Sequence, residues 1–258
     1  MSGTEAVRTW AHPRFELTGT PVTSTLAADS WLVDDGRVLA FERHRLRFAD
    51  AVADAGGDRL DALTAARHAM GAVPAEGRWS PRLDLTPEGI RLRVRPAPPA
   101  TTTVAVATAS RDPRTLPLRK GPDLTALSQL QADESSRLGT AVEPILLSEG
   151  VIAEGTRSAV LWWREGVLCV PAAEIARLPS VTAAVIAEVA RIDGVELRQE
   201  RARPADLAGC EVWLANALRG IRAVTDWADG PAVAPATRAA AWRSRLEGLR
   251  TAPPVSRR

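Results

Sequence analysis

The feature that most constrains the fold is a pair of turn-forming stretches near the middle of the chain. Residues 96–103 read PAPPATTT and residues 111–118 read RDPRTLPL, with a short apolar run between them. Proline fixes φ and lacks a backbone donor, so neither stretch continues a helix or a central strand. With 258 residues, the chain is long enough for two modest cores. We therefore expect a smaller domain over 1–107, a linker at 108–117 and a larger domain over 118–258.

Short strands and helices alternate in the first half. Asp35-Gly36 lies between two apolar runs and predicts a hairpin over residues 24–41. Apolar spacing and turn signals predict helices at 44–55 and 58–71, followed by strands at 78–86 and 89–96. In the last strand Arg91, Arg93 and Arg95 share one face, which we interpret as the solvated face of an edge strand. An anion-binding surface is the alternative interpretation.

The second half shows the same alternation over a longer span. The pattern predicts helices at 123–138, 178–192, just after Pro204, and 235–249, and strands at 144–148, on either side of 164–166, at 195–199 and at 211–215. The pair Trp162-Trp163 places one indole on each face of a strand, one of them in the core. The overall prediction is an α+β protein with a small N-terminal and a larger C-terminal domain.

Composition excludes several classes of protein. The 33 basic and 31 acidic residues leave a net charge of +2, which argues against a nucleic-acid partner. Cys169 and Cys210 are too few for a disulfide framework, and we expect Cys169 to be a small core residue in a reducing cytoplasm. No apolar stretch approaches the roughly 20 residues of a membrane span, and no secretory signal is visible. The three histidines lack metal-ligand spacing, so we expect no metal site.

Lysine occurs once in the chain, at Lys120, whereas arginine fills every other basic position except the histidines. Exposed positions tolerate either cation. A site that needs a primary amine does not, because guanidinium stays protonated and cannot condense with an aldehyde. Lys120 is therefore a candidate reactive amine.

Four segments carry a resemblance to a known family. Lys120 stands in LRKGPDLTAL (118–127), and it is followed in order by VIAEGTRSAVLWWREGVLCVP (151–171), LPSVTAAVIAEVARIDGVELRQE (178–200) and EVWLANALRGIRAVTDW (211–227). This series resembles the class IV aminotransferases, the fold-type IV enzymes that use pyridoxal 5′-phosphate (PLP). FERHRLRF (41–48) extends the resemblance into the first half.

The resemblance implies the architecture and the central chemistry. It implies a small N-terminal α+β domain, a larger domain with a barrel-like mixed sheet, and a homodimer. Lys120 would form a Schiff base with PLP and then move the Cα proton of an amino donor as general base. Amino donor and keto acid are the implied substrates.

Six further residues are assigned to the cofactor by the same resemblance. Glu154 would pair with the pyridine nitrogen of PLP. The phosphate would be held by Val181 and Thr182 at a helix N-terminus, by Asn216 and Ala217 in a strand-to-loop segment, and by Arg47 of the first domain. Each assignment has a purely structural alternative. Glu154 could be a solvated glutamate in a turn, the segment with Val181 and Thr182 could be a simple helix cap, and Arg47 could lie on a solvated helix face.

The sequence also departs from the family pattern. Ala159, Ser180 and Ala183 stand where relatives often have asparagine, glycine and arginine, and residues 18–31 lack the usual glycine-rich strand. The substrate pocket is therefore not predicted. Two alternatives to the aminotransferase remain. One is an aminodeoxychorismate lyase, which would release pyruvate and form 4-aminobenzoate, and the pair Asn216-Ala217 favours it. The other is a member of the family that has lost catalysis.

Overall fold

The structure, a computed structural model, describes residues 6–18 and 24–253. The chain forms two compact units whose segments interleave: unit 1 comprises Met1–Pro99, Arg119–Pro122 and Leu249–Arg258, and unit 2 comprises Ala100–Leu118 and Asp123–Gly248. This division differs from the predicted 1–107, 108–117 and 118–258. Residues 103–108 pair with strands of unit 2, while the Lys120 backbone and Thr251 bond to unit 1. Long-range pairing of this kind leaves no local sequence signal.

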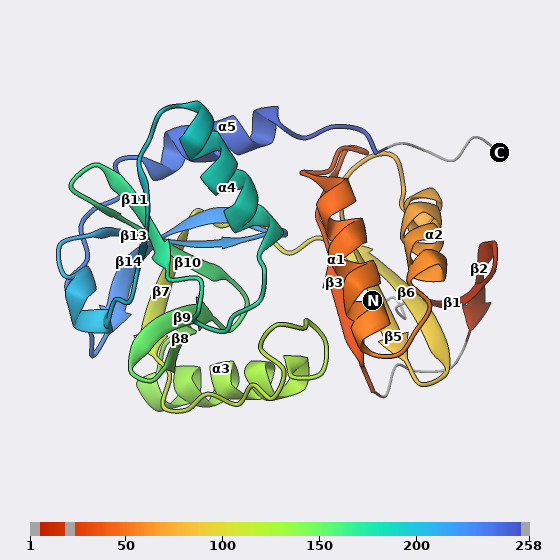
Figure 1. The fold of residues 1–258 in the computed structure, drawn as a ribbon, viewed down its shortest axis with the longest axis horizontal. Helices are drawn as coiled ribbons and strands as arrows, with labels where there is room; N and C mark the ends of the chain where they lie inside the picture. Colours follow the sequence, from red (N-terminus) through yellow and green to blue (C-terminus); the bar gives the residue numbers. More distant parts are fainter. Residues whose placement is uncertain (1–5, 19–23, 254–258) are drawn as a thin grey trace. The chain divides into compact units, whose positions relative to one another are not determined.

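Unit 1 is an antiparallel sheet with two helices on one face (Figure 1). The strand order is β2-β1-β6-β5-β3, and β4 pairs with the other end of β5. Its elements are β1 (Val7–Ala11), β2 (Arg14–Thr18), β3 (Ala27–Ser30), β4 (Val33–Asp34), α1 (Phe41–Asp54), α2 (Arg59–Ala69), the 3-10 turn η1 (Met70–Ala72), β5 (Arg78–Thr86) and β6 (Gly89–Pro96).

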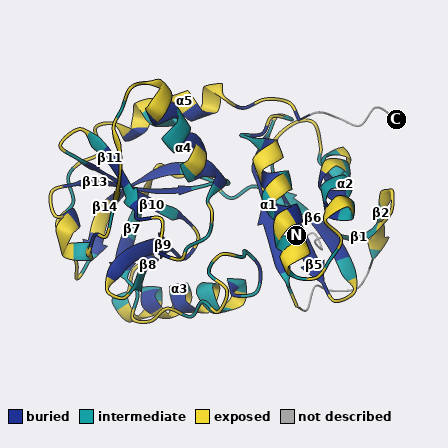
Figure 2. Cartoon of the chain, in the orientation of Figure 1, coloured by how far each residue is buried: buried dark blue, intermediate teal, exposed yellow. Residues whose placement is uncertain are grey.

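The core of unit 1 lies between this sheet and its helices. Phe48 and Val52 of α1 pack with Leu83 of β5 and Leu92 of β6, all essentially without solvent exposure. Asp58 caps α2 by accepting bonds from the next turn's backbone, as an N-terminal aspartate should. Figure 2 shows the buried sheet and the exposed outer sides of α1 and α2.

Two expectations for unit 1 are wrong. The segments on either side of Asp35-Gly36 do not pair along their length: β3 and β4 both pair with β5, and the predicted hairpin is reduced to a tight turn closed by Asp34 and Arg37. The strand that carries Arg91 is not an edge strand, since β6 lies between β5 and β1. The pair β1–β2 supplies the edge that the sequence pattern did not reveal.

Unit 2 is a mixed sheet of eight strands in the order β12-β11-β10-β13-β14-β7-β8-β9. The pairs β11–β12, β14–β7 and β7–β8 are parallel and the others antiparallel. Its elements are β7 (Thr103–Thr108), α3 (Leu124–Leu138), β8 (Glu143–Ser148), β9 (Val151–Gly155), β10 (Ala159–Arg164), β11 (Val167–Pro171), α4 (Val181–Ile192), β12 (Leu197–Glu200), the 3-10 turn η2 (Pro204–Leu207), β13 (Glu211–Asn216), β14 (Gly220–Ala228) and α5 (Ala239–Gly248).

The sheet of unit 2 is curled: β9, at one end of the strand order, lies close to β10, which is near the other end. Helices α3, α4 and α5 pack against β8, β13 and β14 (Figure 1). The predicted hairpin turns are present: Glu149-Gly150 and Glu165-Gly166 both adopt positive φ, and antiparallel strands flank each pair. The predicted α+β class and the mixed sheet of the larger unit are confirmed.

Several details in unit 2 depend on long-range contacts. Helix α5 begins at Ala239, not at 235, because the buried Glu211 carboxylate of β13 accepts backbone N–H bonds from Thr237, Arg238 and Ala239. Both tryptophans of β10 are buried: Trp162 joins the core with Cys169, and Trp163 packs edge-on against Trp213. The predicted core position of Cys169 is confirmed.

Candidate active site

Lys120 belongs to unit 1 although its neighbours along the chain belong to unit 2. Its backbone carbonyl accepts a 2.6 Å bond from Ala28 N of β3, and its Nζ donates a 2.7 Å bond to Ser30 Oγ. Gly121 makes this approach possible: its φ is +142°, and a Cβ there would lie 2.8 Å from the Cα of Ala27. The segment thus holds the amine on the face of the sheet that Ser30 occupies.

The surroundings of Lys120 lower the pKa of its amine. Burial lowers the pKa of Lys120 to about 8; Asp29 opposes this shift, and Arg47 adds to it. An ammonium in water would keep its proton well above that pH. The amine is therefore available as a nucleophile and base near neutral pH, which an arginine at this position would not be.

Asp29 organises a buried ionic group beside Ser30. Arg47 donates from Nε to Asp29 Oδ2 at 2.7 Å and from Nη2 to Oδ1 at 2.8 Å, and His44 Nδ1 lies 3.0 Å from the same carboxylate. Burial by itself would raise the pKa of Asp29, but Arg47 and His44 lower it far below its usual value. Burial also lowers the pKa of His44, so a neutral His44 donates its Nδ1 hydrogen to the carboxylate. Arg47 bonds to Asp29 and Lys120 bonds to the next residue, Ser30, so the two cations lie close enough for Arg47 to lower the pKa of Lys120.

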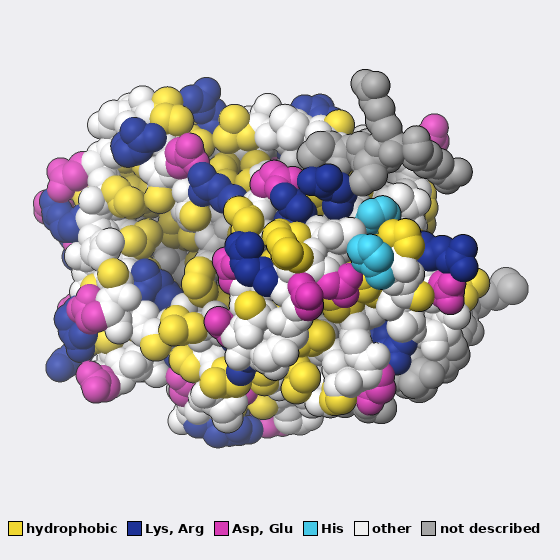
Figure 3. Space-filling view, turned by 45° about the vertical axis from the view of Figure 1, so that its right-hand side comes forward, with side chains coloured by type: hydrophobic (Ala, Val, Ile, Leu, Met, Phe, Trp, Pro, Cys, Tyr) yellow, Lys and Arg dark blue, Asp and Glu magenta, His cyan; other side chains and the backbone are white. Residues whose placement is uncertain are grey.

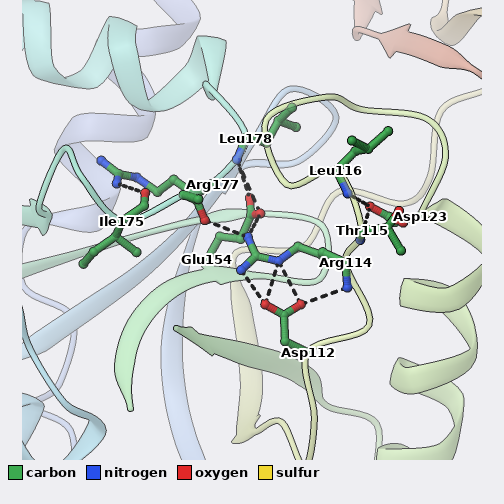
Figure 4. Close-up of polar contacts among 10 residues, drawn as sticks. Asp112, Arg114, Thr115, Leu116, Asp123, Glu154, Ile175, Arg177 and Leu178 are labelled. Atoms are coloured by element: carbon green, nitrogen blue, oxygen red, sulfur yellow. Dashed lines mark hydrogen bonds and ion pairs between the residues drawn. The ribbon is translucent and has the colours of Figure 1, made fainter. Parts of the chain in front are cut away.

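Glu154 lies at the end of β9 in unit 2 and is almost fully buried. Arg114 Nη1 donates a 2.6 Å bond to Glu154 Oε1, while Arg114 Nη2 bonds to Asp112 at 2.6 Å (Figure 4). Burial raises the pKa of Glu154 to about 7, and Arg114 opposes that rise. A buried carboxyl with one shared arginine therefore titrates near neutrality.

Glu154 also contacts the loop that leads into α4. Leu178 N donates to both carboxylate oxygens at 3.3 and 3.4 Å (Figure 4). Three residues later α4 begins at Val181, after Ser180, whose Oγ accepts a 3.2 Å bond from Ala183 N. The first backbone N–H groups of a helix have no partner within it, so Val181 and Thr182 present an anion-binding end. Thr182 itself is buried.

Asn216 ends β13 and closes the following turn. Its Oδ1 accepts bonds from Leu218 N and Arg219 N at 3.1 and 2.9 Å, and its Nδ2 donates to Ser158 Oγ at 2.9 Å. Ala217 lies in this turn and is half-buried. Because Ser158 follows Glu154 on the β9–β10 connection, Glu154 and Asn216 lie on neighbouring segments of unit 2.

A buried cation supports the same connection. Arg222 Nη2 bonds to Glu143 and, at 3.1 Å, to Ser158 Oγ, and Glu143 Oε1 accepts a bond from Arg157 N. Gly155 leaves room for the Glu143 carboxylate, since a Cβ there would lie 2.8 Å from Glu143 Oε1. The segment after Glu154 is therefore held by charged hydrogen bonds.

Sequence reasoning did not identify Asp29, Ser30 or Arg114. Asp29 and Ser30 stand in a segment without a family motif, and Arg114 stands in the stretch interpreted as a linker. Buried partners of this kind become visible only when the fold brings β3 to Lys120 and residue 114 to β9. No local signal distinguished them from solvated residues.

The sequence as a whole shows to which protein family the chain belongs. The family model described as amino-transferase class IV matches residues 26–227, which is most of the chain. The chain belongs to the class IV aminotransferases. Enzymes of this family depend on PLP, so the chain is a PLP-dependent, aminotransferase-like enzyme. No curated protein matches its sequence.

Solved structures share the fold. A hypothetical aminotransferase from Mycobacterium tuberculosis, in its apo form, is 19% identical with a TM-score of 0.76, over 95% of this chain and 98% of that one. The fold IV transaminase CpuTA1 from Curtobacterium pusillum is 20% identical with a TM-score of 0.73, over 94% and 97%. The branched-chain aminotransferase of Escherichia coli is 19% identical with a TM-score of 0.76, over 95% and 94%. The predicted fold-type IV architecture is confirmed.

Within residues 6–18 and 24–253, no helix is long and apolar enough to cross a membrane. The same residues contain no group of three or more His, Cys, Asp or Glu side chains arranged to hold a metal ion. On the face shown in Figure 3, basic and acidic side chains are interspersed rather than gathered by sign.

Proposed function

We propose that the chain is a transaminase that binds PLP covalently through Lys120 and moves an amino group between an amino acid and a 2-oxo acid. The observation that carries the proposal is the Lys120 amine: it is the single lysine of the chain, it is held by Ser30, and its pKa is lowered to about 8. Each property suits an amine that must act unprotonated.

The donor groups present fit the cofactor. PLP offers an aldehyde, a pyridine nitrogen and a phosphate, and the chain offers an amine of lowered pKa, a buried carboxyl and the backbone N–H groups at the start of α4. When bound, PLP withdraws electrons from the carbon that bears the amino group and so acidifies its hydrogen. The phosphate would be held by Val181, Thr182, Asn216 and Ala217, with Arg47 as a further cation.

Lys120 moves the proton. Its Nζ, with a pKa near 8, takes a proton from the substrate carbon and returns it. Ser30 Oγ accepts a bond from that nitrogen and holds it in one direction. The Asp29–Arg47–His44 group behind Ser30 stays charged at neutral pH and contributes a fixed field rather than a second proton carrier.

Glu154 would hold the ring nitrogen. A carboxylate there keeps that nitrogen protonated, and Arg114 favours the charged carboxylate by opposing the rise in pKa that burial causes. Asp112 fixes Arg114 by accepting bonds from both Nε and Nη2. Glu154, Arg114 and Asp112 thus form one hydrogen-bonded group that determines the charge of Glu154 (Figure 4).

We further propose a homodimer that works in the cytoplasm. Both cysteines are unpaired and buried, which suits a reducing compartment.

Sedimentation of the purified protein at several concentrations tests the dimer. A monomer at every concentration would overturn that part of the proposal without affecting the chemistry.

Half-reactions test the proposed function and separate it from the lyase. An amino donor alone should convert the bound cofactor to its amine form, seen as a loss of visible absorbance, and a 2-oxo acid should restore the spectrum. If donors leave the spectrum unchanged while aminodeoxychorismate releases pyruvate, the enzyme is a lyase. If neither reaction occurs in protein that holds PLP, catalysis has been lost.

A further inference from the structure

The connection between β11 and α4 determines where the first turn of α4 lies. Residues 172–180 contain no helix or strand, so no regular ladder of backbone bonds fixes their course. The helix follows directly, and its first residues are Val181 and Thr182. Backbone N–H groups hold an anion only when they point at it within hydrogen-bond distance. Whatever fixes residues 172–180 therefore also fixes the anion-binding end of α4.

Arg177 supplies three hydrogen bonds to the backbone of this part of the chain. Its Nη1 donates to Ala172 O at 2.6 Å and to Ile175 O at 2.9 Å (Figure 4). Its Nη2 donates to Pro171 O at 2.7 Å. All three acceptors precede Arg177 in the chain, so the guanidinium folds the connection back onto the end of β11. A planar fork of donors suits several carbonyl oxygens at once, whereas the single ammonium nitrogen of lysine does not.

The acceptors of these bonds belong to a segment that is itself attached to the sheet of unit 2. Ala172 N donates a 3.0 Å bond to Glu200 O of β12. Ile175 is buried together with Val151 and Ala153 of β9. Backbone bonding and apolar packing thus fix the first half of the connection. The Arg177 bonds attach the residues that follow to this fixed segment.

The second half of the connection contacts the carboxyl that we assign to the ring nitrogen. Ala176 O accepts a 3.1 Å bond from Arg114 Nη1, and Leu178 N donates to both oxygens of Glu154 (Figure 4). Burial lowers the pKa of Arg177, and Glu154 opposes this shift, so the carboxylate lies near enough to act on the guanidinium. Arg177 and the Glu154–Arg114 pair together fix the backbone that leads into α4.

We propose that Arg177 is a positioning residue for the phosphate of PLP: it fixes the connection so that the N–H groups of Val181 and Thr182 point at the phosphate. The inference rests on the proposed function, because it takes the start of α4 as the phosphate site. Both terminal nitrogens of Arg177 are engaged by carbonyl oxygens, so Arg177 acts through the backbone and not through contact with the phosphate. Loss of its bonds should weaken the binding of ligands that bear a phosphate.

Two forms of the cofactor test this role. Pyridoxal has the ring and the aldehyde of PLP but no phosphate, so the ratio of its dissociation constant to that of PLP measures what the phosphate contributes. Both are titrated by absorbance into the purified full chain freed of cofactor. Arg177→Met should reduce this ratio about 10- to 100-fold, the range of lost charged hydrogen bonds, and change the pyridoxal affinity no more than a few-fold.

Two further variants keep the test decisive. Arg177→Lys keeps the charge but not the fork and should lower the ratio only about 2- to 10-fold, and an unchanged ratio would overturn the inference even if Arg177→Met does not fold. Arg201→Met, which breaks an exposed 3.3 Å contact with Glu174 of the same connection, is the matched control and should leave the ratio unchanged. Equal losses of PLP and pyridoxal affinity in Arg177→Met would show a general structural role and overturn the inference.

Binding of inorganic phosphate separates this inference from the proposed function. Calorimetry on the cofactor-free protein should show phosphate binding that Arg177→Met weakens at least about 10-fold and that Lys120→Arg leaves within a few-fold. Absence of phosphate binding in the unaltered protein would remove the start of α4 as the phosphate site, and with it the inference.

The two proposals can fail separately. Transamination through Lys120, with a ratio of affinities that Arg177→Met does not change, would overturn the inference and leave the proposed function standing. Phosphate binding that depends on Arg177, in a protein that forms no borohydride-fixed link at Lys120, would overturn the proposed function and leave the effect of Arg177 on the start of α4 standing.

Discussion

Unit 1 and unit 2 each bury a carboxylate beside an arginine, yet the pKa values of the two carboxyls are shifted in opposite directions. Asp29 accepts two bonds from Arg47, one from His44 and one from Ser30 N, and its pKa is lowered far below the usual range. Glu154 has one short bond from Arg114, and its pKa is raised to about 7.

The difference shows what decides the charge of a buried acid. Burial raises the pKa in both units, and the outcome depends on how many donors oppose it. Arg47 donates from both Nε and Nη2 to Asp29, whereas Arg114 divides its donors between Glu154 and Asp112. Unit 1 thus has a permanent charge next to the amine, and unit 2 has a carboxyl that can respond to pH and to a ligand.

The largest expected effect comes from Lys120→Arg. Arginine keeps the charge but cannot condense with an aldehyde or act as a base near neutral pH, so turnover should fall at least about 1,000-fold. The free energy of unfolding should change by less than about 1 kcal/mol, as for a side chain with a single hydrogen bond. Steady-state kinetics and urea unfolding measure both. Arg119→Lys, the reverse swap at the preceding residue, should leave turnover normal.

Asp29→Asn tests the permanent charge of unit 1. Without the carboxylate, the half-buried Arg47 loses the two bonds that Asp29 accepts from it, and we expect a loss of about 3–5 kcal/mol in the free energy of unfolding. Asp50→Asn, which removes an exposed ion pair between Asp50 of α1 and Arg59 of α2, should cost less than about 1 kcal/mol. Equal effects of the two substitutions in urea titrations would show that Asp29 is not specially placed.

The pH dependence of stability tests the raised pKa of Glu154. A carboxyl whose pKa rises from 4.5 to about 7 on folding favours the folded state below pH 4.5 and loses that contribution as pH rises toward 7. Relative to Glu154→Gln, the cofactor-free protein should therefore lose up to about 3 kcal/mol between pH 4.5 and 8. Urea unfolding of both proteins across this interval gives the difference. A difference that stays flat, or that grows with pH, would contradict the account of Glu154.

Arg114→Met sharpens the same comparison by removing the one short bond to Glu154. The carboxyl should then be neutral at pH 7, and the affinity for PLP should fall about 10- to 100-fold and recover partly at higher pH. Arg114→Lys should keep most of the affinity. Arg111→Met, which breaks a long exposed contact with Asp133, is the control. PLP titration followed by absorbance measures all three, and an unchanged affinity in Arg114→Met would remove Arg114 from the site.

The smallest effect is expected from Ser30→Ala. The variant removes the 2.7 Å bond to the Lys120 amine and should reduce kcat about 2- to 10-fold, with a shift in the pH profile of kcat. Ser30→Thr keeps a hydroxyl and should restore both. A variant with normal kcat and an unmoved profile would mean that Ser30 does not orient the amine.

Local patterns were sufficient for much of the fold. The positive-φ pairs at Glu149-Gly150 and Glu165-Gly166 form turns where the sequence predicts them, and Ser180 caps α4. The assignments of Lys120 and Glu154 stay predictions, and they depend on residue chemistry together with the family pattern. These features could be anticipated because the residues that determine them are neighbours in the chain.

The remaining features depend on distant residues. The central position of β6 follows from its pairing with β1, and the start of α5 follows from Glu211 of β13. The partners Asp29 and Arg114 become visible only when helix α1, 18 residues away along the chain, meets Asp29 and strand β9, 40 residues away, meets Arg114. Hydrophobic periodicity contains no information on such pairings, so the alternating Arg91, Arg93 and Arg95 predict an edge strand where the fold has a central one.

The most direct test of the central claim is where borohydride fixes the cofactor. Purified protein incubated with PLP should absorb in the visible range, and reduction should attach the cofactor to one peptide, at Lys120, identified by mass spectrometry. In Lys120→Arg no peptide should carry it, although PLP can still bind without a covalent link. Attachment at the N-terminal amine alone, or no fixed cofactor in the unaltered protein, would contradict the role of Lys120.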